Sequence, residues 1–294
     1  MGYKGPISQR QRRFGEELQR LRMAAGLSAA EAGALVGMGG PAVSHTEAGR
    51  ITLNAERLEV WLDAYGCTDV AYRSTLAEMG RSTGKGWWSE YEGKVPPLAL
   101  DLAEAEDRSV RLANYEMLYI PGPLQLQAYA EAIFGGPYGD GKWSNADAVQ
   151  FRMDRQRVLE EDREFHFVIH EAALRMRFPG DAVMRAQLLH VLDMAERPNI
   201  TVQVMPFTAA EKPPSPNSFL FCEPACIDLS TIIVDAPGRA EHYGDPESIA
   251  AYRQMFDQLK DLALPAVSAA EPRSGVAFRD SWGLLHHLLY LIQV

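Results

Sequence analysis

The 294-residue chain has little cysteine and no long apolar run. Its three cysteines, Cys67, Cys222 and Cys226, are few and odd in number, which is typical of a reducing compartment and excludes a disulfide framework. No stretch of 18 apolar residues occurs, and the N-terminus lacks an apolar core followed by a cleavage site. We therefore expect a cytoplasmic protein that has no membrane partner.

Sequence motifs of catalysis are also missing. There is no H-E-x-x-H zinc motif, Gly-rich phosphate loop or G-x-S-x-G elbow, and the spacing of four in "CEPAC" fits no common redox or zinc pair. His166 and His170 lie on the same side of an expected strand. A strand that leads into a helix accounts for this segment without a catalytic or metal-binding role for the two histidines. We predict no catalytic residue, no metal and no cofactor; an enzyme recruited from another scaffold is the alternative reading.

Positive charge is scarce overall, since the net charge is −10, but it is unevenly placed. Residues 1–82 carry ten Lys and Arg against nine Asp and Glu, whereas the remainder carries nineteen against thirty. The first 22 residues hold only two acidic side chains beside six cations: Lys4, Arg10, Arg12, Arg13, Arg20 and Arg22. A small head before an acidic body is the arrangement expected if only the head approaches phosphates.

The head has the pattern of five short helices. Apolar residues recur at helical spacing in each segment, and Gly26 ends the first while Ser28 is placed to cap the second. Gly37 ends the second helix, and Pro41 suits the first position of a short third helix. The pattern predicts a mainly helical domain over residues 1–82.

The stretch "GLSAAEAGALVGMGGPAVSHTEAGR", residues 26–50, resembles the helix-turn-helix core of the lambda-repressor-like, or XRE-type, family. The usual family pattern is GLSQEELAERLGVSRSTVSRIERGR, and the spacing from Leu27 through Gly37 and Val43 to Glu47 and Gly49 is kept without a gap. The resemblance implies a five-helix fold that binds double-stranded DNA. A helical bundle that merely shares this plan is the alternative.

In such folds the second helix of the pair lies in the major groove. The groove-facing candidates here are Gly40, Pro41, Ala42, Ser44 and His45. We predict phosphate contacts from Arg12, Arg13, Ser28 and Arg50, because cations and helix N-termini position a protein on DNA without reading its sequence. No Arg is available to fork onto a guanine, and Ala29 stands where the family usually has Gln, so we expect weak base reading at each site.

Residues 83–97 are predicted to be a linker whose aromatic side chains, Trp87, Trp88 and Tyr91, dock on the second domain. Residues 98–268 mix the two periodicities and predict an α+β domain with a small sheet. Helices are expected over 98–117, 121–134, 145–161, 181–200 and 245–264. Strands are expected within 164–175, which then turns helical, and over 201–207, 217–223, 227–235 and 240–243.

The body resembles the DUF5753 domain of Scr1-family antitoxin-like transcriptional regulators from actinobacteria. The segments that carry this resemblance are "YIPGPLQLQAYAEAIF", "RMDRQRVLEE", "HEAALRMRFPGDAVMRAQLLHVLDMAERPNITVQVMPF" and "SIAAYRQMFDQLKDLAL". It implies a DNA-binding regulator with a small DUF397-like protein as partner. We further expect a homodimer.

The tail, residues 269–294, has no assigned role. Its "SGVAFRDS" looks like a segment of DUF397 proteins, and we hypothesise that residues 274–294 occupy the partner surface. Besides the regulator, two readings stay open: a ligand or partner-binding module with weakened DNA reading, and the enzyme named above.

Overall fold

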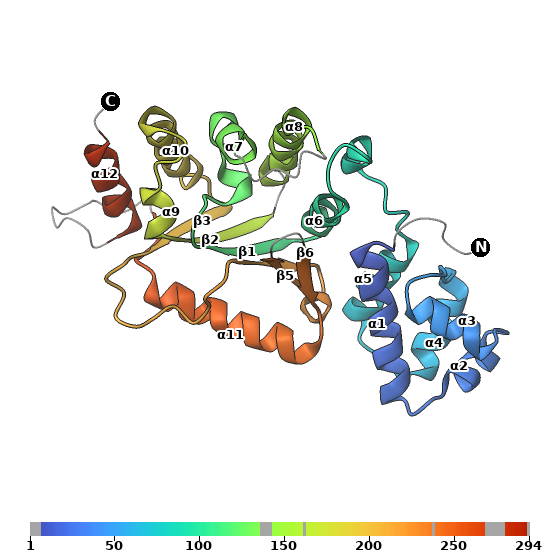
Figure 1. Cartoon of the computed structure of the whole chain (residues 1–294). Coiled ribbons are helices and arrows are strands. Elements are labelled where there is room, and N and C mark those ends of the chain that lie inside the picture. Colours follow the sequence, from blue (N-terminus) through green and yellow to red (C-terminus); the bar gives the residue numbers. More distant parts are fainter. Residues whose placement is uncertain (1–6, 136–142, 161–162, 237–238, 268–279, 293–294) are drawn as a thin grey trace. The chain divides into compact units, whose positions relative to one another are not determined.

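The computed structural model describes residues 7–135, 143–160, 163–236, 239–267 and 280–292. The chain divides into two compact units (Figure 1). Unit 1 comprises Met1–Ser89 together with Pro224–Ser230, and unit 2 comprises Glu90–Glu223 together with Thr231–Val294. Among the described helices, none is long and apolar enough to cross a membrane.

Unit 1 contains the five predicted helices of the head. Serine begins the first two, because Ser8 and Ser28 each form a capping box with the residue three positions on. Asn54 and Asp69 cap the fourth and fifth helices by accepting a backbone N–H. The helices are α1 (Gln9–Ala24), α2 (Ala29–Leu35), α3 (Gly40–Glu47), α4 (Ala55–Ala64) and α5 (Val70–Arg81).

A single apolar core joins these helices. Leu18, Trp61 and Leu76 are completely buried in it, and the indole Nε1 of Trp61 donates to the carbonyl oxygen of Ala32 at 2.8 Å. The core also takes in Cys226 and Leu229 from the segment around the 3-10 helix η4 (Ile227–Leu229). The helix-turn-helix domain is therefore completed by seven residues that lie far away in the sequence.

Unit 2 is built on a six-stranded mixed sheet with the order β3-β2-β1-β4-β5-β6. The first three neighbours run parallel, and the pairs from β1 to β4 onward run antiparallel. The strands are β1 (Arg111–Glu116), β2 (Glu164–His170), β3 (Ile200–Met205), β4 (Phe219–Glu223), β5 (Thr231–Ala236) and β6 (Arg239–Tyr243). The predicted α+β class is confirmed, and the sheet is larger than expected.

The helix predicted over residues 98–117 is wrong in its second half. Helix α6 (Pro97–Asp107) ends before Arg108, and residues 111–116 form β1 between β2 and β4. Leu112 faces one apolar cluster of the sheet and Tyr115 faces the other, which is the alternation of a central strand. Pairing on both sides decides the conformation of this stretch and overrides its local helical periodicity.

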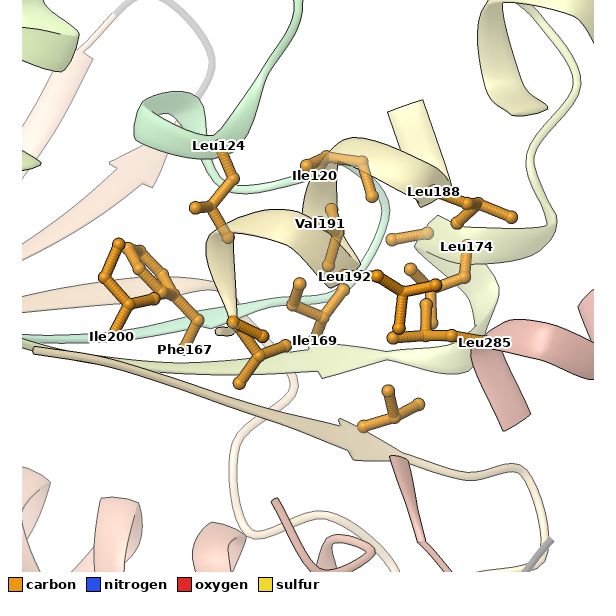
Figure 2. Close-up of a cluster of buried hydrophobic side chains, with 14 of the residues drawn as sticks. Ile120, Leu124, Phe167, Ile169, Leu174, Leu188, Val191, Leu192, Ile200 and Leu285 are labelled. Carbon is orange, nitrogen blue, oxygen red and sulfur yellow. The ribbon is translucent and has the colours of Figure 1, made fainter. Parts of the chain in front are cut away.

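Helices cover both faces of this sheet (Figure 1). One face carries α7 (Gln127–Phe134), α8 (Asn145–Arg155), α9 (Glu171–Arg175) and α10 (Asp181–Met194), and the other carries α11 (Pro246–Leu262). Figure 2 shows the first of the two cores, in which Phe167 and Ile169 of β2 meet Leu188 and Val191 of α10. Among the linker aromatics, Tyr91 packs edge-on against Phe151 of α8, as predicted for that residue.

The C-terminal helix α12 (Ser281–Leu291) belongs to the same core as α10. Leu285 and Leu288 are fully buried, and the Ser281 hydroxyl accepts the backbone N–H of Val204 at 2.8 Å. Helix α12 therefore packs on the body of its own chain. Most of the DUF397-like stretch, residues 274–279, lies outside the described residues.

Candidate nucleic-acid interface

Helix α3 divides cleanly into an inward and an outward side. Val43 and Thr46 are completely buried, and the Thr46 hydroxyl donates to the carbonyl oxygen of Ala42 at 3.0 Å. Pro41, Ser44 and His45 are exposed. The predicted groove-facing side chains are thus on the solvent side of the helix.

Two glycines, which have no side chain, allow α3 and the turn before it to lie close against α1 and α2. A Cβ atom on Gly33 of α2 would lie 2.3 Å from the carbonyl oxygen of Met38, so only glycine fits at this point of the turn. A Cβ atom on Gly15 of α1 would lie 2.1 Å from the carbonyl oxygen of Glu47. The spacing of the helix-turn-helix pair, and of α1 behind it, is set by these two contacts.

A buried ion pair fixes the end of α3. The guanidinium of Arg22 on α1 holds both carboxylate oxygens of Glu47, with Nε–Oε1 at 2.5 Å and Nη2–Oε2 at 3.0 Å. Its third nitrogen donates to the carbonyl oxygen of Leu27 at 2.7 Å. The hydrogen bond to Glu47 raises the pKa of Arg22. Sequence reasoning missed this pair, although the position of Arg22 four residues after buried Leu18 was a signal for an inward side chain.

Several arginines of the basic N-terminal stretch form contacts within unit 1, and one of these contacts corrects the prediction for Arg13. Arg13 is 6% exposed, forms an ion pair with Glu17 and donates to the carbonyl oxygen of Asp228. Arg20 shares that carboxylate, and Arg10 donates to the carbonyl oxygen of Met79. Arg13 is therefore a structural residue and not a phosphate contact, because its charge is neutralised and covered.

The remaining predicted phosphate contacts are on the surface. Arg12 and Arg50 are exposed, and Arg50 follows α3 directly. Ser28 is exposed too, but its hydroxyl accepts the N–H of Glu31, whose carboxylate in turn accepts the N–H of Ser28. An acidic side chain therefore stands at the N-terminus of α2, where a phosphate would otherwise find favourable dipole charge.

Gly40 and Ala42 complete the predicted set and are partly exposed. Gly40 also faces α2, because a notional Cβ atom on it would be in ordinary van der Waals contact with the backbone of Ala30, at 3.5 Å. The candidates that remain are Gly40, Pro41, Ala42, Ser44 and His45 for base contacts and Arg12 and Arg50 for phosphate contacts. Ser28 lies beside them as a helix cap.

The two histidines of the predicted strand in unit 2 have separate structural contacts. His166 shares a hydrogen bond of 2.7 Å with Oε1 of Gln203, and His170 caps α9 by accepting the N–H of Ala172 through Nδ1. Among the described residues, no group of three or more His, Cys, Asp or Glu side chains is placed to hold a metal ion.

The class of protein follows from unit 1 and from comparison with known families. Residues 13–76 match the model of a helix-turn-helix domain, which supports a DNA-binding regulator. Residues 99–271, more than half of the chain, match the model described as Domain of unknown function (DUF5753). The chain belongs to this DUF5753 family and carries a helix-turn-helix domain in front of it. No curated protein and no solved structure matches the chain.

Proposed function

We propose that the protein is a transcriptional regulator in which α3 enters the major groove of DNA. The observation that carries this proposal is the exposure of Ser44 and His45 on a helix whose opposite side is buried and whose end is held by Arg22 and Glu47. A recognition helix needs a buried side that is held rigidly and an exposed side that is free to contact bases. A loosely held side chain would not discriminate between bases.

Base reading rests on small and neutral groups. The Ser44 hydroxyl and the His45 ring can exchange hydrogen bonds with base edges, and the Ala42 methyl can contact the methyl group of thymine. Arg12 and Arg50 bind phosphates on either side. Each good bidentate pair between a side chain and a base edge contributes about 1–3 kcal/mol of discrimination against the wrong base. Because α3 has no Arg or Lys to form such a pair with guanine, a single head discriminates only weakly between DNA sequences.

Weak discrimination between base sequences by a single head favours a homodimer. Two heads on one duplex double the base contacts and gain from effective concentration, so discrimination becomes adequate without an arginine in α3. The operator would then contain two half-sites about 10–10.5 base pairs apart, or a multiple of that spacing.

The C-terminal domain is the regulatory half in this proposal. It receives a small protein partner of the DUF397-like kind, or a ligand, and the acidic balance of residues 83–294 suits a partner and keeps this half off phosphates. Family resemblance supports the partner, and the enclosed space described below supports a ligand.

Mobility shift on the region upstream of its own coding sequence tests the proposal. We expect a specific shift that weakens steeply between 50 and 200 mM salt, at about 0.9 in log K per phosphate contact and log unit of salt. Arg12→Ala together with Arg50→Ala should weaken binding to all sequences and lower that slope by about 2. The matched control is Arg81→Ala, an exposed arginine at the end of α5.

A second candidate function is a partner-binding module that no longer reads DNA. The absence of Arg and Lys from α3 and the carboxylate of Glu31 at the start of α2 favour it. This candidate predicts binding of a neighbouring small protein in calorimetry and no shift with any DNA fragment at 50 mM salt. A specific shift excludes it.

A further inference from the structure

A small cavity in unit 2 lies between the sheet and the segment that includes α6 and the 3-10 helix η2 (Gly122–Leu124). Its volume is about 60 Å³. Its apolar wall includes Leu112, Phe165, Phe167, Leu220 and Ile233. Since a single water needs roughly 10–15 Å³ by this measure, the space holds several waters or one small molecule.

Charged groups line the same cavity at unusual depth. Glu106 of α6 is 1% exposed and Arg155 of α8 is 7% exposed, and Nε of Arg155 lies 2.7 Å from Oε2 of Glu106. The two groups form an ion pair, but neither carboxylate oxygen of Glu106 meets hydrogen-bond geometry with a partner among the described residues, and the same holds for Nε of Arg155. Buried acceptors without donors are costly, so a bound molecule that supplies N–H donors would be stabilised here.

Two further carboxylates have no ion pair within the described part of the chain. Glu116 at the end of β1 accepts hydrogen bonds from Nδ2 of Asn114, at 3.5 Å, and from the side chain of Ser218, and Asp235 of β5 is exposed and lines the cavity. Burial raises the pKa of Glu116 to about 7, and the charge of Asp235 adds to this effect. The charge of Arg152 acts in the opposite direction, but Glu116 and Arg152 form no ion pair among the described residues.

The cations nearby are already engaged. Arg155 faces Glu106, and Arg152 donates to Oε1 of Gln125 at 2.9 Å and stacks over the ring of Phe134. A Cβ atom on Gly122 would lie 2.7 Å from Nη1 of Arg152 and 2.8 Å from Nη2 of Arg155, so both guanidinium groups lie directly on the backbone of η2. Three carboxylates and one guanidinium face the cavity itself.

We propose that this cavity binds a small organic cation, a primary amine with a short apolar chain, between Glu116 and Asp235. The ammonium group donates to these two carboxylates, and the chain lies on Leu112, Phe167 and Ile233. An anion would meet an excess of negative charge, and no group of three or more His, Cys, Asp or Glu side chains among the described residues is placed to hold a metal ion. The inference rests on the proposed function, whose ligand it specifies.

Calorimetry on the whole chain with n-butylamine as the probe tests this site. We expect one site per chain, and we expect n-butanol and butyrate, which have the same length but no positive charge, to bind at least about tenfold more weakly. Glu116→Gln should weaken n-butylamine binding by about tenfold or more, and Asp235→Asn by less because it is exposed. The matched control is Glu211→Gln, an exposed glutamate of unit 2.

A pH series adds a readout that a structural role would not move. The amine requires ionised Glu116, so its affinity should fall as the pH drops through about 7, and Glu116→Gln should remove that fall. Asn114, Ser218, Arg152 and Asp235 are the polar and charged groups that act on this carboxyl, and burial also raises the pKa of Glu106, which lines the same cavity.

Three results would overturn the proposal: no binding of n-butylamine up to about 50 mM, equal binding of butyrate, or unchanged affinity in both variants. If Glu116→Gln does not fold, Asp235→Asn and the pH series decide. These titrations contain no DNA, so a failure to detect binding would rule out the amine site and would not affect the proposal that the protein binds an operator. A failed mobility shift would, in turn, leave an amine site standing.

Discussion

Arg22 and Glu47 form a buried two-point ion pair that ties α1 to the last turn of α3. Their side chains lie 25 positions apart in the sequence, so the pair reports on the assembled head and not on a single helix. The side chain of Glu47 is buried on the inward side of α3, whereas Ser44 and His45 are exposed.

Replacing one partner of this pair should be severe. Arg22→Met leaves the carboxylate of Glu47 buried without a cation, and we expect a loss of about 3–5 kcal/mol in the free energy of unfolding of the head. The Trp61 indole resonance, whose N–H is bonded to Ala32, follows unfolding of this unit in urea. The double variant Arg22→Met, Glu47→Met should lose less than Arg22→Met alone. Additive losses would show that the two residues are not coupled.

Gly15→Ala tests the close approach of α1 to α3. The new methyl would overlap the carbonyl oxygen of Glu47, so the helices have to separate, at a cost of about 1–3 kcal/mol in stability and with a loss of specific DNA binding. Gly39→Ala is the control, because its Cβ atom would meet only the Cδ of Pro41, at 3.8 Å. Equal melting temperatures for the two variants would contradict this account.

Acid should unfold unit 1 through Glu17. Burial raises the pKa of this carboxyl, but hydrogen bonds from Arg20 and the charge of Arg13 outweigh burial, and the net pKa is lowered. A lowered folded-state pKa means that the stabilisation is complete above the ordinary value of about 4.3 and is lost as the pH falls through the folded value.

The variant Glu17→Gln should therefore flatten the acid dependence of the Trp61 resonance below pH 5 while lowering stability at pH 7. Exposed Glu78→Gln is the control and should leave both unchanged. An acid midpoint of the Glu17 variant equal to that of the unaltered chain would contradict the assignment.

Leu229 tests whether the distant segment completes the head. Its side chain is 2% exposed within the core of unit 1, so Leu229→Ala should cost about 2–5 kcal/mol of stability there and weaken DNA binding accordingly. The neighbouring Asp228→Ala keeps that core intact and serves as the control. A Trp61 resonance with the same urea midpoint in both variants would show that the head folds without this segment.

Local signals were sufficient for most of the fold. Serine caps, glycine stops and apolar spacing predicted the five helices of the head, and alternation predicted five of the six strands. The strand that was missed, β1, lies in the middle of the sheet. Its two neighbouring strands lie more than 40 positions away in the sequence, and no signal within residues 98–117 indicates where the helical pattern ends. Long-range pairing also explains the addition of residues 224–230 to the head.

The site was predicted less completely than the fold. The sequence pattern of α3 predicted the exposure of Ser44 and His45, whereas charge counting assigned Arg13 to phosphates and did not reveal that Arg22 is buried as well. Both lie on the inward face of α1 with an acidic partner, and the partner of Arg22 comes from another helix. Counting cations therefore overestimates a DNA surface wherever the cations lie on the buried face of a helix.

The most direct test of α3 as the reading helix is the ratio of affinities for the operator and for a scrambled duplex of equal length. It is measured by fluorescence anisotropy at one salt concentration for the unaltered chain, for Ser44→Ala with His45→Ala, and for exposed Ser74→Ala on α5. The account predicts a high ratio for the unaltered chain and for Ser74→Ala, and a ratio near one for the double variant. A double variant that keeps the ratio of the unaltered chain would contradict it.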